Sequence, residues 1–306
     1  MSLALNTRIS LPAGFRPSDV LALHARDAQQ LAERVEDFTV TKGITWQGRP
    51  ALLQLQLHPA EARASLQVDG GTEANAAQQA ALNAMLARML GLADSVPQFE
   101  QQFAVHPVLG KLLQAQAGLR VPASSTPFEA LVWAITGQQI SVAAAIALRR
   151  RLIEASSVRH SSGLFCHPDA QALAALTPEQ LRAAGFSVSK IATLERVCAA
   201  IQDGGLPLDA WAAQSAQAEV PAQQIETALL AIKGIGPWTV HYALLRGFGW
   251  LDGSLHGDVA VRNALAKLLD LPSVSQSEAE QWLASFKPWR ALVAAHLWAS
   301  LSAKAY

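Results

Sequence analysis

The sequence predicts a mainly α-helical protein that begins with a small α+β domain. In the first hundred residues, segments with strand-like or helix-like patterns follow the order strand, helix, three strands, helix. That order is typical of a small antiparallel sheet with helices on one face. From residue 96 to residue 306, almost every segment instead has the apolar spacing of about 3.6 residues that marks a helix. Of the 306 residues 51% are hydrophobic and 16% are charged, which suits a large buried core.

The elements of the N-terminal domain follow from periodicity and turn residues. Residues 3–11 alternate as a strand, and Pro17 opens a helix that we expect to continue to residue 35. Residues 51–58, ALLQLQLH, show the clearest two-residue alternation and come after a hairpin turn at residues 47–50. The remaining expected elements are strands at residues 38–46 and 64–68 and a helix at residues 74–92.

Capping residues and glycines divide the helical part. Thr177-Pro178-Glu179-Gln180 is the strongest start signal, because it combines a threonine N-cap, a proline at the first helical position and a glutamine three residues after the cap. The expected helices span residues 99–116 (one or two helices), 127–137, 141–155, 169–176, 177–185, 190–203, 208–215, 222–232, 237 onward, 259–269, 277–286 and 289–303.

The charge balance does not point to a strongly basic nucleic-acid-binding protein. Lys and Arg together number 24, as do Asp and Glu, so the formal net charge is zero. Any positive surface must therefore arise from local arrangement, and backbone N–H groups are expected to supply part of any grip on phosphate. The candidate basic residues are Arg149, Arg150, Arg151, Lys190, Lys233, Arg246, Arg262 and Lys287.

The two cysteines, Cys166 and Cys198, are too few for a disulfide framework or for an iron–sulfur cluster held by four thiolates. We expect each to be a buried apolar thiol. No run of 18 apolar residues is present, and residues 1–8 lack the pattern of a signal peptide. These features predict a cytoplasmic protein that does not enter membranes.

A glycine-containing turn between two helices is the most informative stretch. Lys233-Gly234-Ile235-Gly236 follows an apolar helix end, and Pro237 suits the first position of the next helix. The resulting helical hairpin leaves free N–H groups at a helix N-terminus, which can bind an anion such as a DNA phosphate. The alternative reading is a tight connection without a ligand.

Asp258 lies 22 positions after Gly236 and directly before an apolar helix pattern. Taken alone, it reads as an N-cap. Taken together with the upstream hairpin and the aromatic residues of its second helix, it reads as a catalytic carboxylate. A capped and buried Asp258 would favour a protein that only binds DNA, whereas Asp258 beside an aromatic pocket would favour an enzyme.

This stretch resembles the helix-hairpin-helix DNA glycosylases, and among them the DNA-3-methyladenine glycosylase II family. Residues 134–142, AITGQQISV, resemble that family's A-I-x-G-Q-x-x-S-V segment, and residues 287–290 and 296–298 resemble its K-P-W-R and H-x-W motifs. The resemblance implies a two-lobed helical core behind the small sheet domain. We therefore expect an N-terminal domain at 1–95 that forms one wall of the pocket, a helical lobe at 96–124 plus 251–306, and a central lobe at 125–250 that ends in the hairpin.

The resemblance implies a glycosylase that flips alkylated purines out of duplex DNA and excises them in base excision repair, leaving an abasic site. Asp258 is then the catalytic residue, and Trp238, Tyr242 and Trp298 line the base pocket. A single carboxylate suffices because alkylated purines already carry positive charge and leave readily. Aromatic faces suit such a cationic base, since stacking and cation–π attraction both favour it.

The resemblance also assigns residues that contact DNA. The wedge that fills the gap left by the flipped base corresponds to Gln139, with Ile140 beside it, although the family has an apolar residue at this position. A monovalent cation, Na⁺ or K⁺, is expected on the backbone carbonyls of Leu230, Ile232 and Ile235, and no other cofactor is required. The hairpin residues expected at the DNA are Lys233, Gly234, Ile235, Gly236 and Thr239.

Bifunctional relatives carry a lysine nucleophile in the second hairpin helix, and the corresponding residue here is Trp238. We therefore expect base release without strand cleavage. The expected partner is double-stranded DNA with damaged bases, bound by a monomer that associates with the nucleoid. Two alternatives remain open: a non-catalytic DNA-binding protein, and a glycosylase for oxidised or deaminated bases.

Overall fold

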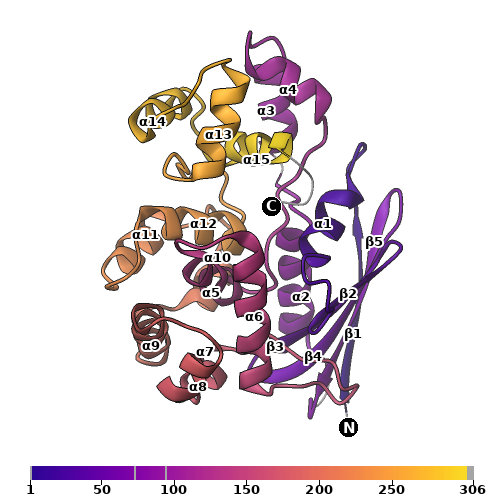
Figure 1. Cartoon of the computed structure of the whole chain (residues 1–306). Helices are drawn as coiled ribbons and strands as arrows, with labels where there is room; N and C mark the ends of the chain where they lie inside the picture. The colour runs from indigo at the N-terminus through magenta and orange to yellow at the C-terminus, as the bar shows by residue number, and fades with distance from the viewer. Residues whose placement is uncertain (1, 72–73, 94, 302–306) are drawn as a thin grey trace.

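The computed structural model describes residues 2–71, 74–93 and 95–301. The sheet lies against one side of the helical body, and the helices form two groups (Figure 1). The strands are β1 (Ser2–Ser10), β2 (Glu33–Glu36), β3 (Thr39–Trp46), β4 (Arg49–Leu57) and β5 (Glu61–Asp69). The helices of the first part of the chain are α1 (Pro17–His24), α2 (Ala76–Met89), α3 (Ser95–Phe103) and α4 (Leu109–Ala115).

The helices of the larger part begin and end close to the predicted residues. Thr177 and Gln180 form the predicted capping box, whereas α9 starts at Val188 because Ser187 caps it instead of Ser189. Residues 302 and 303 of the expected helix 289–303 lie outside the described residues. These helices are α5 (Pro127–Gly137), α6 (Val142–Ser156), α7 (Ala170–Ala174), α8 (Pro178–Ala183), α9 (Val188–Gln202), α10 (Leu208–Ser215), α11 (Ala222–Leu230), α12 (Pro237–Phe248), α13 (Val259–Leu268), α14 (Gln276–Ala284) and α15 (Arg290–Leu301).

The sheet is antiparallel throughout, in the order β1-β5-β4-β3-β2. Along β5 the side chains alternate, so that Leu66 and Val68 are buried and Arg63 and Gln67 are exposed. The buried face packs with α2, whose Leu82 joins the same hydrophobic cluster. The predicted small antiparallel sheet with a helix on one face is therefore confirmed.

The helix expected to continue to residue 35 is wrong in its second half. α1 ends at His24, and residues 33–36 form β2, which pairs with β3 in the register Glu33↔Lys42. The buried Glu33 carboxylate accepts a hydrogen bond from Lys42 and a second from Arg149 of α6. These tertiary ion pairs override the local helical spacing, because a helix could not bring Glu33 to the edge of the sheet.

Buried side chains form three hydrophobic clusters. The first lies between the sheet and α2. The second gathers α5 to α12 around Leu131, Leu194 and Val240. The third joins α3 and α4 to α13, α14 and α15 around Phe99 and Leu265. Tyr242 of α12 belongs to this third cluster, so α12 connects the two helical groups. The domain boundaries stay a prediction.

The cysteines agree with the expectation of buried thiols. Cys166 and Cys198 are both free and buried. Burial raises the pKa of the Cys166 thiol to about 11 and that of Cys198 to about 12, so neither is a ready nucleophile. Among the described residues, none of the helices is long and apolar enough to cross a membrane.

Buried histidines make the stability depend on pH. Burial lowers the pKa of His167 to about 4 and that of His296 to about 3, while the unfolded chain has a histidine pKa near 6.5. Below that value the unfolded chain binds more protons than the folded one, so stability falls as the pH drops. We expect each histidine to remove roughly 2 kcal/mol from the free energy of unfolding by pH 5.

Urea unfolding at pH 7.5 and pH 5 measures this difference. The variant His296→Gln should show a smaller loss than the wild type. An unfolding free energy that is equal or higher at pH 5 in the wild type would contradict the expectation.

Candidate active site

The predicted hairpin joins α11 to α12. Gly234 has φ +102°, and a Cβ atom built on it would lie 2.0 Å from Thr193 Oγ1 of α9, so only glycine fits. Gly236 has φ −110° and open space at its Cβ position. Glycine is therefore required at position 234, whereas at position 236 its missing side chain leaves the start of α12 open.

No described side chain caps the N-terminus of α12. Its first amides therefore keep their hydrogen-bonding capacity for an external anion. Ile235 is 7% exposed and packs into the core of the central helices, and the Thr239 hydroxyl is buried and accepts a hydrogen bond from Gln138. Both side chains thus hold the hairpin in place.

A matched pair of glycine variants separates folding from binding at the hairpin. Gly234→Ala should lower the free energy of unfolding by about 1–3 kcal/mol, because the new methyl group meets Thr193 and the positive φ becomes strained. Gly236→Ala should cost less than about 1 kcal/mol, since its backbone is ordinary and its surroundings are open. Gly236→Ala should nevertheless weaken binding of abasic duplex DNA. Thermal unfolding and fluorescence anisotropy would show both effects, and equal stability of the two variants would contradict this account.

Asp258 is the N-cap of α13. Its Oδ1 accepts hydrogen bonds from the backbone amides of Ala260 at 2.8 Å and Val261 at 3.1 Å. The indole N–H of Trp238 donates to Oδ2 at 2.9 Å, and that of Trp298 donates to Oδ1 at 3.3 Å. The side chain is only half-buried and lines a cleft. Capping is thus concentrated on Oδ1, whereas Oδ2 accepts from Trp238.

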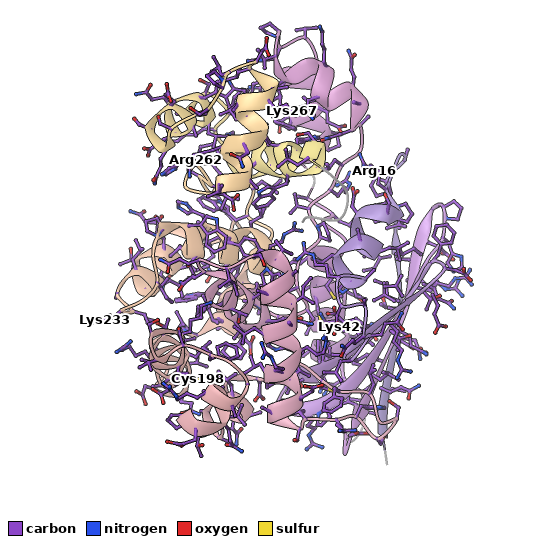
Figure 2. The ribbon with its side chains drawn as sticks, viewed as in Figure 1. Arg16, Lys42, Cys198, Lys233, Arg262 and Lys267 are labelled. Atoms are coloured by element: carbon purple, nitrogen blue, oxygen red, sulfur yellow. The ribbon has the colours of Figure 1, made fainter. Side chains whose placement is uncertain are left out.

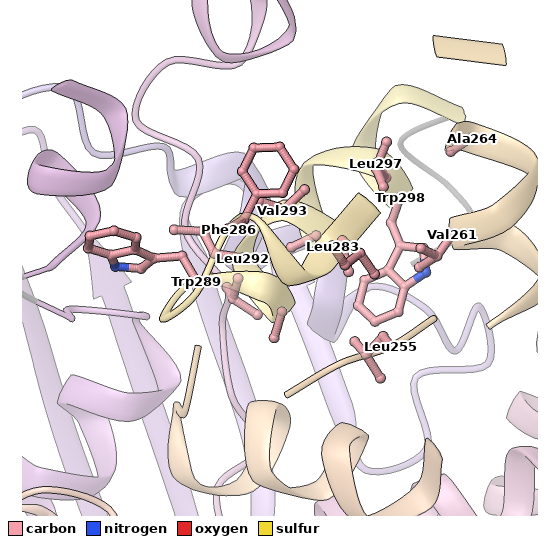
Figure 3. Close-up of a cluster of buried hydrophobic side chains, with 14 of the residues drawn as sticks. Leu255, Val261, Ala264, Leu283, Phe286, Trp289, Leu292, Val293, Leu297 and Trp298 are labelled. Carbon is pink, nitrogen blue, oxygen red and sulfur yellow. The ribbon is translucent and has the colours of Figure 1, made fainter. Parts of the chain in front are cut away.

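The three predicted pocket aromatics surround this carboxylate. The rings of Trp238 and Tyr242 lie 5.3 Å apart between centroids, and those of Tyr242 and Trp298 lie 6.2 Å apart. Trp238 and Tyr242 are four residues apart on α12 and so share one face of the helix. Trp298 reaches the site from α15, where it packs with Leu255 and Val261 (Figure 3).

The carboxylate and the aromatics line one cleft of about 1340 Å³. This volume exceeds that of a typical small-ligand pocket of roughly 300–1,000 Å³. The cleft lies between the two helical groups, and Arg26 of the N-terminal region also lines it. The expectation that the N-terminal domain forms one wall stays a prediction. Of the predicted site residues, the cleft is lined by Gln139, Ile140, Gly234, Gly236, Trp238, Thr239, Tyr242, Asp258 and Trp298.

Gln139 and Ile140 project at the rim of this cleft. Gln139 is exposed and has φ +58°, a left-handed conformation that is uncommon for a residue other than glycine. Ile140 is 39% exposed. Gln138 supports the segment, since its amide donates to the Gly234 carbonyl and the Thr239 hydroxyl, each at 3.0 Å. The end of α5 is thereby fixed to the hairpin.

Three of the eight candidate basic residues, Arg149, Arg150 and Lys190, are engaged by other groups of the protein, which corrects the expectation that they form a DNA-facing surface. Arg149 binds Glu33 and Glu129, and Arg150 binds Asp27. Lys190 donates to the Thr136 carbonyl. Lys233 is exposed, and it lies at the outer edge of the molecule (Figure 2). Arg149 and Arg150 of the arginine run thus fasten the N-terminal domain to α6 and leave few cations for DNA.

Several cleft residues, among them the five described next, were not assigned to the site from the sequence. Trp133 lines the cleft, and the central carbon of the Arg26 guanidinium lies 5.5 Å from the centroid of the Trp133 ring. The side chain of Arg26 comes from a segment that the sequence wrongly assigned to a helix. The others were not singled out as pocket residues because their roles depend on contacts between distant segments: they are Gln138, Arg246 and His256.

The predicted cation carbonyls lie at the end of α11, at Leu230, and in the turn that follows it, at Ile232 and Ile235. The Ile232 carbonyl accepts a hydrogen bond from the Ile235 amide at 3.1 Å, and a carbonyl oxygen has a second lone pair that could bind a cation. Leu230 is 42% exposed and Ile235 is buried. Backbone carbonyl oxygens such as these are the type of ligand that a monovalent cation requires. In the described part of the chain, no three His, Cys, Asp or Glu side chains gather as metal ligands.

Comparison with known proteins finds relatives in both sequence and structure. The chain is 32% identical over 198 residues to DNA-3-methyladenine glycosylase 2 of Escherichia coli, an alignment that covers 63% of this chain and just under two thirds, 64%, of that relative. Among solved structures, the 3-methyladenine DNA glycosylase of Archaeoglobus fulgidus superimposes with a TM-score of 0.76 at 19% identity, covering 95% of this chain and 97% of that one. Schizosaccharomyces pombe Mag1 in complex with abasic DNA gives a TM-score of 0.55 at 25% identity over 66% of this chain and 95% of that one.

The family comparison covers the part of the chain that builds the site. Residues 132–288, half of the chain, match the family described as HhH-GPD superfamily base excision DNA repair protein. This range includes the hairpin, Trp238, Tyr242 and Asp258. The chain therefore belongs to the HhH-GPD superfamily of base excision DNA repair proteins.

Proposed function

We propose that the protein is a DNA glycosylase that flips alkylated purines out of duplex DNA and hydrolyses their N-glycosidic bond, leaving an abasic site. The observation that carries this proposal is the Asp258 carboxylate, which lines a cleft together with Trp238, Tyr242 and Trp298 and is held by the indole N–H groups of both tryptophans. The names of the Escherichia coli and Archaeoglobus fulgidus relatives support the same substrate class.

The geometry suits a reaction that needs little help to expel the base. An extruded purine enters the cleft and stacks near Trp238 and Tyr242, where aromatic faces favour an electron-poor ring. Its sugar then lies at Asp258, whose negative charge stabilises the cation that develops on the deoxyribose and orients the attacking water. The two indole N–H groups and the α13 amides hold the carboxylate in one orientation, so no reorganisation is needed during the reaction.

The hairpin and the cleft rim would hold the distorted duplex. Free amides at the start of α12 bind a backbone phosphate, with Lys233 beside them, and Gln139 and Ile140 fill the gap that the extruded base leaves. A Na⁺ or K⁺ ion on the carbonyls of Leu230, Ile232 and Ile235 would brace the same turn. We propose that the protein acts on DNA as a monomer.

We propose that the enzyme does not cleave the strand. A lyase needs an amine nucleophile close to the anomeric carbon, and Trp238, which holds Asp258, occupies the corresponding place on α12. Base release is therefore not followed by strand cleavage, and the product is an intact strand with an abasic site.

The test is incubation of the protein with methylated duplex DNA. We expect free methylpurines in solution, together with strands that break only after alkali treatment. Strand breaks without alkali would contradict the monofunctional assignment. Tight binding to abasic DNA without any released base would instead favour the alternative, a DNA-binding protein whose Asp258 serves only as a helix cap.

A further inference from the structure

Three side chains of α12 form a ladder that leads inward from the catalytic carboxylate. Trp238, Tyr242 and Arg246 are spaced four residues apart and all line the cleft. Successive side chains of such a ladder are separated by about 6 Å along a helix. Trp238 donates a hydrogen bond to Asp258. When the deoxyribose lies at that carboxylate, the edge of the base farthest from the sugar is therefore directed past Tyr242, toward Arg246.

Arg246 brings hydrogen-bond donors to the inner end of the cleft. Its side chain is 6% exposed, and its Nη1 donates to the Pro122 carbonyl at 2.7 Å. Its Nε is buried and has no partner among the described residues. Burial lowers the pKa of Arg246 to about 10, so the guanidinium stays charged at neutral pH. Because Arg246 lines the cleft, its guanidinium can present N–H donors to an acceptor on a bound ligand.

Arg26 adds a second guanidinium from the N-terminal domain. It lies over the Trp133 ring at 5.5 Å, lines the same cleft, and its Nε is also buried without a partner among the described residues. Arg26 and Arg246 both border the small cavity behind the cleft as well, together with Trp133 and Tyr242. The two guanidiniums therefore meet where the cleft reaches the domain boundary.

The nearby carboxylates are already engaged by other cations. Glu33 and Glu129 each contact both Lys42 and Arg149, and Asp27 is held by Arg150. These pairs leave Arg26 and Arg246 as the cations of the inner end without a carboxylate partner within salt-bridge distance in the described chain. Guanidinium groups donate hydrogen bonds and accept none.

We infer that Arg26 and Arg246 select bases that carry an oxygen on the edge opposite the sugar, as 7-methylguanine and other 6-oxopurines do, over 6-aminopurines such as 3-methyladenine. This inference rests on the proposed function and specifies its substrate preference. An oxygen at position 6 accepts from a guanidinium, whereas an amino group there presents N–H donors to N–H donors and leaves the buried arginine donors unpaired.

Heat-methylated duplex DNA, which contains both lesions, tests the inference in one reaction. Released 7-methylguanine and 3-methyladenine are separated by chromatography, and each initial rate is divided by the wild-type rate for that lesion, so that the different intrinsic reactivities cancel. Arg26→Met should lower the ratio of 7-methylguanine to 3-methyladenine release about tenfold, the effect of losing one hydrogen bond to a charged group. Arg34→Met, at an exposed arginine of β2 outside the cleft, should leave the ratio unchanged.

The outcomes distinguish the inference from the function on which it rests. Equal losses for both lesions in Arg26→Met, with weaker binding of abasic DNA, would mean that Arg26 grips phosphate and would overturn the inference, as would an unchanged ratio. If the wild type releases no base at all, the proposed function fails. Quenching of tryptophan fluorescence by the free bases then still decides the inference, which predicts tighter binding of 7-methylguanine than of 3-methyladenine in the wild type and loss of that preference in Arg26→Met.

Discussion

Replacement of Asp258 by asparagine is expected to slow base release about a thousandfold. A carboxylate about 4 Å from the developing sugar cation stabilises it by about 4 kcal/mol at the effective dielectric constant of a partly exposed site. That energy corresponds to roughly three orders of magnitude in rate. The measurement is the single-turnover rate of 7-methylguanine release from duplex DNA, with protein in excess so that weaker binding cannot lower the rate.

Asparagine separates the two roles of this residue. Its amide oxygen can still accept from the Ala260 and Val261 amides, because asparagine and aspartate are comparable N-caps. Asp258→Asn should therefore keep the fold and the affinity for abasic DNA. Asp258→Ala, the matched variant, removes the cap as well and should lose about 1 kcal/mol of stability in addition. A rate within tenfold of the wild type in Asp258→Asn would remove the carboxylate from the mechanism.

Replacement of Lys42 by methionine is expected to lower the free energy of unfolding by about 3–5 kcal/mol, as removal of one partner from a buried ion pair does. Lys42 lies on β3, where the sheet meets the helices (Figure 2), and it is 1% exposed. Its Nζ contacts Glu33 and, at 2.7 Å, Glu129 of α5. In Lys42→Met, the buried carboxylates of Glu33 and Glu129 would have only the positive charge of Arg149 between them.

Acid titration provides a second readout of this network. Burial by itself would raise the pKa of Glu129, but Lys42 and Arg149 outweigh it and hold that pKa well below its usual range. A carboxylate with a lowered pKa contributes stability above its unfolded pKa, near 4.5, and this contribution is lost as the pH falls. Lys42→Met raises the folded pKa, so its stability should depend less on pH between 3 and 5 than that of the wild type.

Urea unfolding followed by circular dichroism measures both effects of Lys42→Met. Lys111→Met, at an exposed lysine of α4, serves as the control and should change the free energy of unfolding by less than about 0.5 kcal/mol. A loss below about 1 kcal/mol in Lys42→Met would show that the ion-pair network does not fasten the N-terminal domain.

The sequence predicted those parts of the fold whose signals are local. The Thr177 capping box, the Pro127 helix start and the alternation of residues 51–58 each depend on a few neighbouring residues, and the structure contains all three. The continuation of the first helix to residue 35 failed for the opposite reason. Glu33 is placed by partners at positions 42, 129 and 149, and no local pattern contains that information.

The same distinction explains which site residues could be found. Trp238, Tyr242 and Asp258 lie within a short span and on a recognisable pattern, and the structure brings them together. Arg26 and Trp133 meet only because the N-terminal domain packs against α5, so their proximity had no sequence signal. Asp258 was weighed as either a cap or a catalyst. The structure shows the cap, which is centred on Oδ1, and the catalytic role remains our proposal.

The most direct measurement compares the single-turnover rate of 7-methylguanine release by the wild-type protein with spontaneous loss of the same base from the same duplex. An enzyme of the proposed kind should exceed the spontaneous rate by at least about a millionfold. Release at the spontaneous rate from duplex that the protein demonstrably binds would contradict the proposal and leave a protein that grips DNA without acting on it.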